Sequence, residues 1–157
     1  MATASRTAIQ TSATGFWRFV PWMSRLVMFP PLIIFTLIML RYFTDPGRAI
    51  SGTILTTPET FTDTRVIGAW MLTLLILLVT FLLSRERLWM GHLQLVVFMA
   101  TALVARIFGF LHDGTTLATG NQRIITIVEF VFLILNSIGL VLQAAWLKNK
   151  TFSGSNG

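Results

Sequence analysis

Cysteine is absent from this chain, and charged residues are scarce. Without cysteine there is no disulfide framework, no thiolate nucleophile, and no Cys-based zinc, haem or iron–sulfur site. Only 11% of the residues are charged and 54% are hydrophobic, whereas soluble domains carry about 25% charged residues. The chain therefore lacks the polar surface that would cover a globule in water, and its apolar residues fall in blocks. Both features indicate an integral membrane protein.

The usual catalytic and metal-binding signatures are also missing. The chain contains no GxSxG, HExxH, P-loop or glycine-rich dinucleotide turn. Its two histidines, His92 and His112, are expected at opposite membrane faces, so no metal site is predicted. No feature identifies a cofactor. The net charge of +6 comes from basic residues at the ends of apolar blocks, which indicates contact with anionic lipid and no nucleic-acid partner.

Four apolar blocks predict an all-α fold, an integral membrane four-helix bundle. The expected spans cover about residues 22–43, 66–83, 89–111 and 124–147. Together they make a transmembrane domain of residues 22–148, with a polar N-terminal tail (1–21) and a flexible C-terminal tail (149–157). The second block has no charged residue and is the plainest span.

The distribution of basic residues predicts the orientation of the bundle. With four spans, both termini and the turn between the second and third spans share one face. That face carries most of the basic residues, namely Arg6, Arg18, Arg25, Arg85, Arg87, Lys148 and Lys150. The opposite face has Arg41, Arg48, Arg65 and Arg123. The positive-inside rule then places both termini in the cytoplasm.

Polar residues recur inside the third and fourth spans at matching intervals. His92, Met99 and Arg106 are seven residues apart, and so are Glu129, Asn136 and Gln143. Seven residues return to nearly the same helix face. In an antiparallel hairpin, Arg106 and Glu129 should lie at one depth as an intramembrane polar pair. The same register then predicts Met99 opposite Asn136 and His92 opposite Gln143.

These polar positions allow two interpretations. The first is structural, an ion pair and amides that fix helix pairing. The second is a polar cavity in which His92, Asn136 and Gln143 face a lipid headgroup, a quinone-like carbonyl or a proton.

Near the other face, Arg65, Asp113 and Arg123 could form a charge network with Glu129, and solvated loop charges are the alternative.

An ordered set of residues suggests a family. It consists of Asp63, Arg65 and Gly68, then Ala105, Arg106 and Gly109, then His112, Asp113 and Gly114, and finally Glu129. With this set, residues 44–142 resemble a family of small uncharacterised bacterial membrane proteins, a four-helix domain of unknown function. Members have a glycine-rich start to the second span, where this chain has only Gly68. A fainter likeness to the four-helix scaffold proteins of ergosterol synthesis implies tethering.

Three functions follow from these observations, and they are given in descending order of support. The first is a non-catalytic accessory or structural subunit of a larger membrane complex, of respiratory or photosynthetic type, with other membrane subunits as partners. The alternative is a binding protein or transporter for a small amphiphile or lipid that uses the intramembrane Arg/Glu/Asn site. A membrane enzyme ranks last, because two residues that neutralise each other are poorly suited to catalysis. The resemblance implies the inner membrane of a bacterium as the location.

Overall fold

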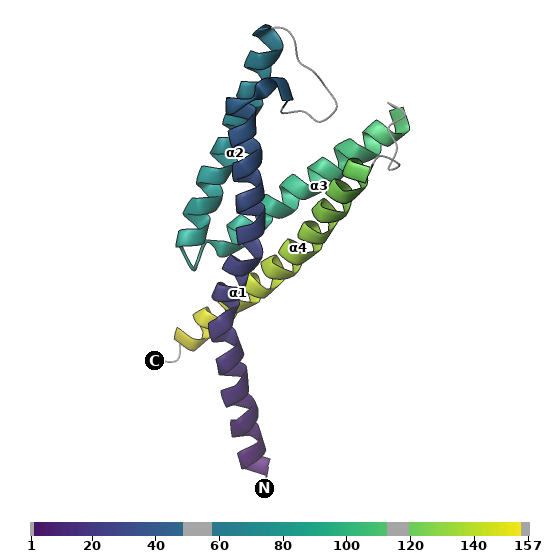
Figure 1. Cartoon of the computed structure of the whole chain (residues 1–157). Coiled ribbons are helices and arrows are strands. Elements are labelled where there is room, and N and C mark those ends of the chain that lie inside the picture. The colour runs from purple at the N-terminus through teal and green to yellow at the C-terminus, as the bar shows by residue number, and fades with distance from the viewer. Residues whose placement is uncertain (1, 49–57, 113–119, 155–157) are drawn as a thin grey trace.

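Four long helices form the protein in a computed structural model that describes residues 2–48, 58–112 and 120–154. They are α1 (Ala2–Thr44), α2 (Pro58–Leu83), α3 (Leu88–His112) and α4 (Gly120–Gly154), as Figure 1 shows. A short 3-10 helix, η1 (Pro46–Arg48), follows α1. Side chains are described for residues 15–47, 58–59, 61–111 and 123–150. The predicted all-α four-helix bundle is confirmed.

Each helix contains a segment that is long and apolar enough to cross a membrane. These segments are Gly15–Thr44, Phe61–Leu83, Leu88–Leu111 and Arg123–Lys150. The chain is therefore an integral membrane protein whose helices contact lipid. Most of the large apolar side chains on these helices are exposed in the isolated bundle, as expected where hydrocarbon rather than water surrounds them.

The outer helices extend past the apolar spans. α1 begins at Ala2, so residues 2–21 of the expected polar tail are helical, and α4 continues to Gly154 within the tail expected to be flexible. Residues 2–14 and 149–153 contain neither proline nor glycine. A helix that starts in the membrane can thus propagate through them without a new nucleation step. Residues 155–157 lie outside the described residues.

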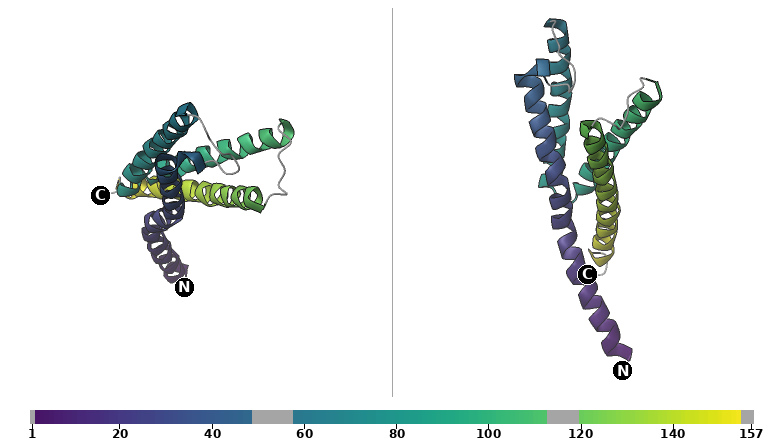
Figure 2. Two further views of the ribbon diagram at one scale, coloured as in Figure 1. Left: turned by 45° about the horizontal axis from the view of Figure 1, so that its top comes forward. Right: turned by 45° about the vertical axis from the view of Figure 1, so that its right-hand side comes forward.

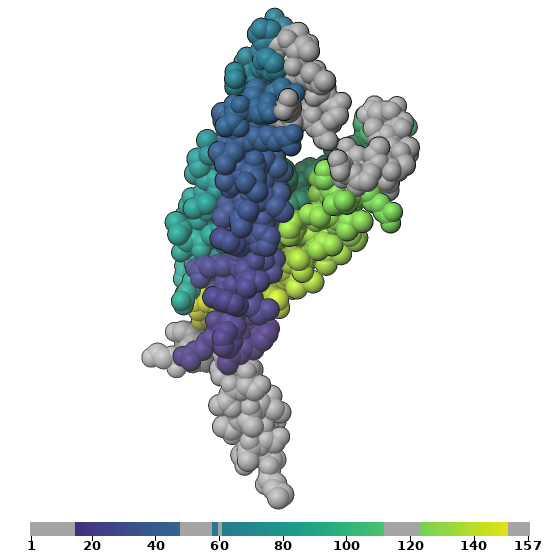
Figure 3. Space-filling model, viewed as in Figure 1, coloured from purple at the N-terminus to yellow at the C-terminus, as the bar shows by residue number. Residues whose placement is uncertain are grey.

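The bundle consists of two hairpins that meet at one end. α1 packs along α2 and α3 packs along α4, and α1 also contacts α4. The hairpins lie together near the α2–α3 turn and the C-terminus, and they diverge toward the opposite end (Figures 1 and 2). The space-filling view shows the same separation between the far ends of α1 and α4 (Figure 3). The packing is therefore tight at one end only.

The apolar core lies where α1, α2 and α3 meet. Its buried side chains are Met28, Phe35, Leu75, Leu78, Leu88, Leu95 and Met99. The rings of Phe35 and Phe98 are 4.8 Å apart, edge to face, a favourable geometry for aromatic pairs. Gly91 allows α1 to approach α3, since a Cβ there would lie 2.8 Å from the Met28 Sδ. This core joins the two hairpins.

Polar contacts tie three helices together at the end where the hairpins meet. Arg25 of α1 donates from Nε to the carbonyl of Leu82 at 2.9 Å, which satisfies one of the last carbonyls of α2. Lys150 of α4 pairs with Glu86 of the α2–α3 turn at 2.6 Å. Lys150 also lies over the Trp146 ring, 5.7 Å from its centroid. The turn and the C-terminal end of α4 thus share one face of the bundle.

Removing Lys150 should change the titration of Glu86. The hydrogen bond and charge of Lys150 lower the pKa of Glu86 from its ordinary value of 4.5. Because the pKa is lowered in the folded protein, the stabilisation is present above 4.5 and is lost as pH falls through the lowered pKa. We expect Lys150→Met to raise the pKa of Glu86, measured by ¹³C NMR of its carboxyl group. High salt should shift the wild-type pKa the same way; an unchanged pKa in the variant would contradict the pair.

Candidate functional site

The strongest polar contact inside the membrane joins α3 to α4. Arg106 donates from Nε to Glu129 Oε2 at 2.5 Å and from Nη2 to Glu129 Oε1 at 2.8 Å. The contact is a bidentate, charge-assisted pair. The two side chains keep 22% and 16% of their surface exposed. The ion pair that the hairpin register predicts is therefore present, near the end where the two hairpins diverge.

His92 has a different partner from the one the register predicts. Its Nδ1 lies 2.9 Å from Asn136 Oδ1. Asn136 donates from Nδ2 to the Phe132 carbonyl at 2.8 Å, so its oxygen must face the imidazole. Since that oxygen only accepts, the Nδ1 of a neutral His92 carries the proton. His92 and Gln143, expected opposite each other, thus bond to other residues. Met99 is buried in the apolar core, and its expected place opposite Asn136 stays a prediction.

Gly139 explains this shift. A Cβ at Gly139 would lie between 2.3 and 2.8 Å from three ring atoms of His92. The imidazole therefore rests on the bare backbone of Gly139, one turn of α4 before Gln143, and reaches Asn136 from there. Arg106 still meets Glu129 because its long side chain can span about a helical turn. The polar residues are equally spaced on the two helices, but they do not pair in the order that this spacing predicts.

Gln143 joins three segments. It is fully buried; its Oε1 accepts a hydrogen bond from Ser24 Oγ at 3.2 Å, and its Nε2 donates to the Arg85 carbonyl at 2.8 Å. One amide therefore links α1, α4 and the α2–α3 turn. The sequence pattern does not predict Ser24 or Gly139, because neither has a long polar side chain.

The predicted charge network at the other face is incomplete in the described residues. Arg65 and Arg123 are exposed, and no ion pair between described residues joins either of them to Glu129. Asp113 lies outside the described residues. α2 and the α3–α4 hairpin diverge at this end (Figure 1). The described residues also contain no cluster of three His, Cys, Asp or Glu that could hold a metal ion.

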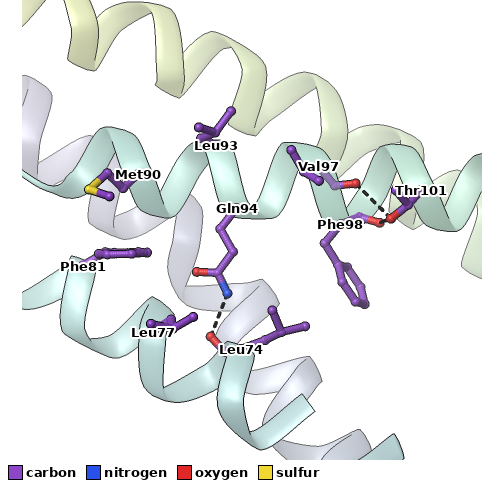
Figure 4. A pocket seen from close by; sticks show the side chains of 9 residues that line it. All are labelled: Leu74, Leu77, Phe81, Met90, Leu93, Gln94, Val97, Phe98 and Thr101. Carbon is purple, nitrogen blue, oxygen red and sulfur yellow. Dashed lines mark hydrogen bonds between the residues drawn. The ribbon is translucent and has the colours of Figure 1, made fainter. Parts of the chain in front are cut away.

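A groove of about 430 Å³ runs between α2 and α3 (Figure 4). Its lining is apolar except for Gln94 and Thr101. Gln94 donates from Nε2 to the Leu74 carbonyl at 2.8 Å, while its Oε1 is buried without a partner. A second hollow of about 320 Å³ lies on α4 beside Ser137. Neither is lined by His92, Asn136 or Gln143, and Gln94 is not among the predicted site residues.

Comparison with known proteins gives no relative. No family model, curated protein or solved structure matches the chain. The four long apolar helices agree with the four-helix part of the resemblance drawn from the sequence, and membership of that family stays a prediction. The site must therefore be interpreted from its own geometry.

A methyl group at Gly139 should break the contact between α3 and α4. The ring of His92 is rigid and fully buried, so it cannot move aside without losing Asn136. We expect Gly139→Ala to lower the free energy of unfolding by roughly 1–3 kcal/mol, measured by denaturation in mixed micelles. Gly15→Ala is the matched control, because a Cβ there has no atom within 4 Å. Equal loss in both variants would contradict the assignment.

Breaking one side of the ion pair should cost more than replacing both sides. Glu129→Gln leaves the Arg106 charge within the span without its carboxylate, which should destabilise by roughly 2–3 kcal/mol. The double variant Arg106→Met, Glu129→Leu removes both charges and should recover most of that loss. Unfolding in mixed micelles measures both. A double variant as unstable as Glu129→Gln would show that the unpaired charge is not the cause of the lost stability.

Proposed function

We propose that this protein is a non-catalytic accessory or structural subunit of a larger membrane protein complex. The observation that carries the proposal is the incomplete burial of the Arg106–Glu129 pair, whose side chains are 22% and 16% exposed. Ionisable groups at membrane depth usually face a protein interior or a water-filled cavity. A neighbouring subunit seated between the diverging hairpins would complete the cover that the chain lacks.

The remaining polar residues support a structural role. His92, Asn136 and Gln143 are fully buried, and their hydrogen bonds go to one another's helices, to Ser24 and to backbone carbonyls. Groups used in this way hold helices together. His92 Nε2 is buried without a partner among the described residues, and neither hollow is lined by His92. Arg106 and Glu129 neutralise each other, so neither is poised for acid–base chemistry. The polar stripe therefore favours helix pairing over amphiphile binding or catalysis.

The distribution of basic residues and the projection of α1 also support an orientation of the subunit in the membrane. The basic face contains the termini and the α2–α3 turn, which favours both termini in the cytoplasm of a bacterial cell. The first part of α1 projects beyond the rest of the bundle on that side (Figures 1 and 2). A helix that extends past its own bundle offers a contact to a neighbouring subunit. Respiratory and photosynthetic assemblies are the complexes that this type of small subunit fits.

Gentle extraction tests the proposal. Membranes from the native host, with the chain tagged at its C-terminus, would be solubilised in digitonin and separated on a blue native gel. We expect the tagged chain in a band far heavier than its own 17.6 kDa, with the same membrane proteins recovered from that band in each preparation. An intact chain that migrates as an isolated monomer would contradict the proposal.

A matched pair of variants tests the ion pair as the contact. Arg106→Met with Glu129→Leu should release the chain from the heavy band while its own helix content stays unchanged. Thr73→Val is the control, since Thr73 is an exposed side chain on α2 whose hydroxyl bonds only its own helix. If both variants remain in the heavy band, the partner contacts another face.

A further inference from the structure

We propose that the groove between α2 and α3 binds an uncharged amphiphile with an apolar body and one hydroxyl group, which donates a hydrogen bond to the side-chain carbonyl of Gln94. This inference goes beyond the accessory role and concerns the parts of α2 and α3 nearer their turn. It does not use the Arg106–Glu129 pair.

The groove has the size and lining of a site for an apolar body. Its volume of about 430 Å³ falls in the range of small-molecule pockets, roughly 300–1,000 Å³. Leu74, Leu77 and Phe81 line it from α2, and the lining from α3 is apolar apart from Gln94 and Thr101. In Figure 4, Gln94 and Phe98 extend from α3 toward α2, whereas Leu93 and Val97 lie along the other edge of α3. Hydrocarbon would fill such a groove, but hydrocarbon cannot satisfy Gln94.

The geometry of Gln94 sets the chemistry of the missing partner. Its Nε2 donates to the Leu74 carbonyl at 2.8 Å. Turning the amide over would set two oxygens against each other, so the nitrogen is fixed on Leu74 and the oxygen points away along the groove. That Oε1 is buried and has no partner among the described residues. A carbonyl oxygen can only accept, so the complementary group must be a donor.

Thr101, the other polar side chain of the groove, does not need a hydrogen-bond partner from a ligand. Its hydroxyl bonds to the carbonyls of Val97 and Phe98 at 3.0 and 2.9 Å. Its polarity is therefore satisfied within its own helix. Gln94 is the lining side chain that has an unused polar atom, and it defines one anchoring point within an apolar surface.

The depth of Gln94 and the absence of a lining charge favour a hydroxyl over a charged headgroup. Gln94 lies about 9 Å along α3 from Leu88, which is inside one leaflet of a hydrocarbon core about 30 Å thick. No lining residue carries a charge, so a phosphate would find no counterion there. A hydroxyl just below the headgroups, as in a diacylglycerol, reaches this depth.

A ligand must move one neighbour to reach the oxygen. The carbonyl end of Gln94 points toward Phe81 in Figure 4, with Met90 beside it, and the oxygen is covered. Methionine is unbranched and adapts its shape readily, and Met90 is exposed at the groove surface. A ligand therefore reaches the oxygen only after a side chain at the edge of the groove has moved, and Met90 is the unbranched one.

Photolabelling of the purified full-length chain in phosphatidylcholine nanodiscs tests the proposal. The probe is a diacylglycerol with a diazirine in one acyl chain, and its matched control has the hydroxyl acetylated. We expect the free-hydroxyl probe to label groove residues of α2 and α3 two- to tenfold more than the control, the gain of roughly one hydrogen bond. Gln94→Leu should reduce labelling to the level of the control probe, and Thr101→Val should not.

Several results would overturn the proposal. Equal labelling of the wild type by both probes would mean that bulk acyl chains occupy the groove, and labelling outside α2 and α3 would place the site elsewhere. Unchanged labelling in Gln94→Leu would exclude the carbonyl as the anchor. The comparison of the two probes needs no variant, so it decides the question even if Gln94→Leu does not fold. The experiment contains no partner subunit, so its outcome is independent of the accessory role.

Discussion

The hydrocarbon core of a bilayer offers no hydrogen-bond partner, so a polar side chain on a transmembrane helix must find one inside the protein. In this chain the contact that most depends on this constraint is His92 of α3 resting on Gly139 of α4 and bonding to Asn136. It brings the two helices close and sets their register. Once that register is fixed, Gln143 turns toward α1 and the α2–α3 turn.

The polar contacts that supply these partners are unevenly distributed along the bundle. At the end with the termini, Gln143, Arg25 and Lys150 bond to neighbouring segments, and the two hairpins are held together there. At the opposite end the main polar contact is Arg106–Glu129, which lies within one hairpin and does nothing to join it to the other. The hairpins diverge there (Figure 2). The surface between them is where a neighbouring subunit would fit.

The two candidate sites differ in the kind of polar group that they present. The stripe on α3 and α4 bonds mostly within the protein, although His92 Nε2 is buried without a partner among the described residues, and neither hollow reaches it, which suits a structural role. Gln94 has one satisfied atom and one unused atom beside an apolar groove, which suits recognition of a small amphiphile. The sequence favoured the stripe because its members recur at the same seven-residue spacing on both helices. The sequence does not predict a role for Gln94, because its partner is a backbone carbonyl on α2 and no side-chain pattern reveals such a partner.

The sequence alone determined that this is a membrane protein of four helices, since apolar length and charge content depend on composition and not on packing. It also determined the Arg106–Glu129 pair, because a charge inside a span leaves few alternatives and a long arginine tolerates an error of one turn. Only the tertiary structure decided the partners of His92 and Gln143, the role of Gly139 and the unused oxygen of Gln94. Side chains shorter than arginine reach less than one turn along a neighbouring helix, so a small shift in helix register changes which of them meet.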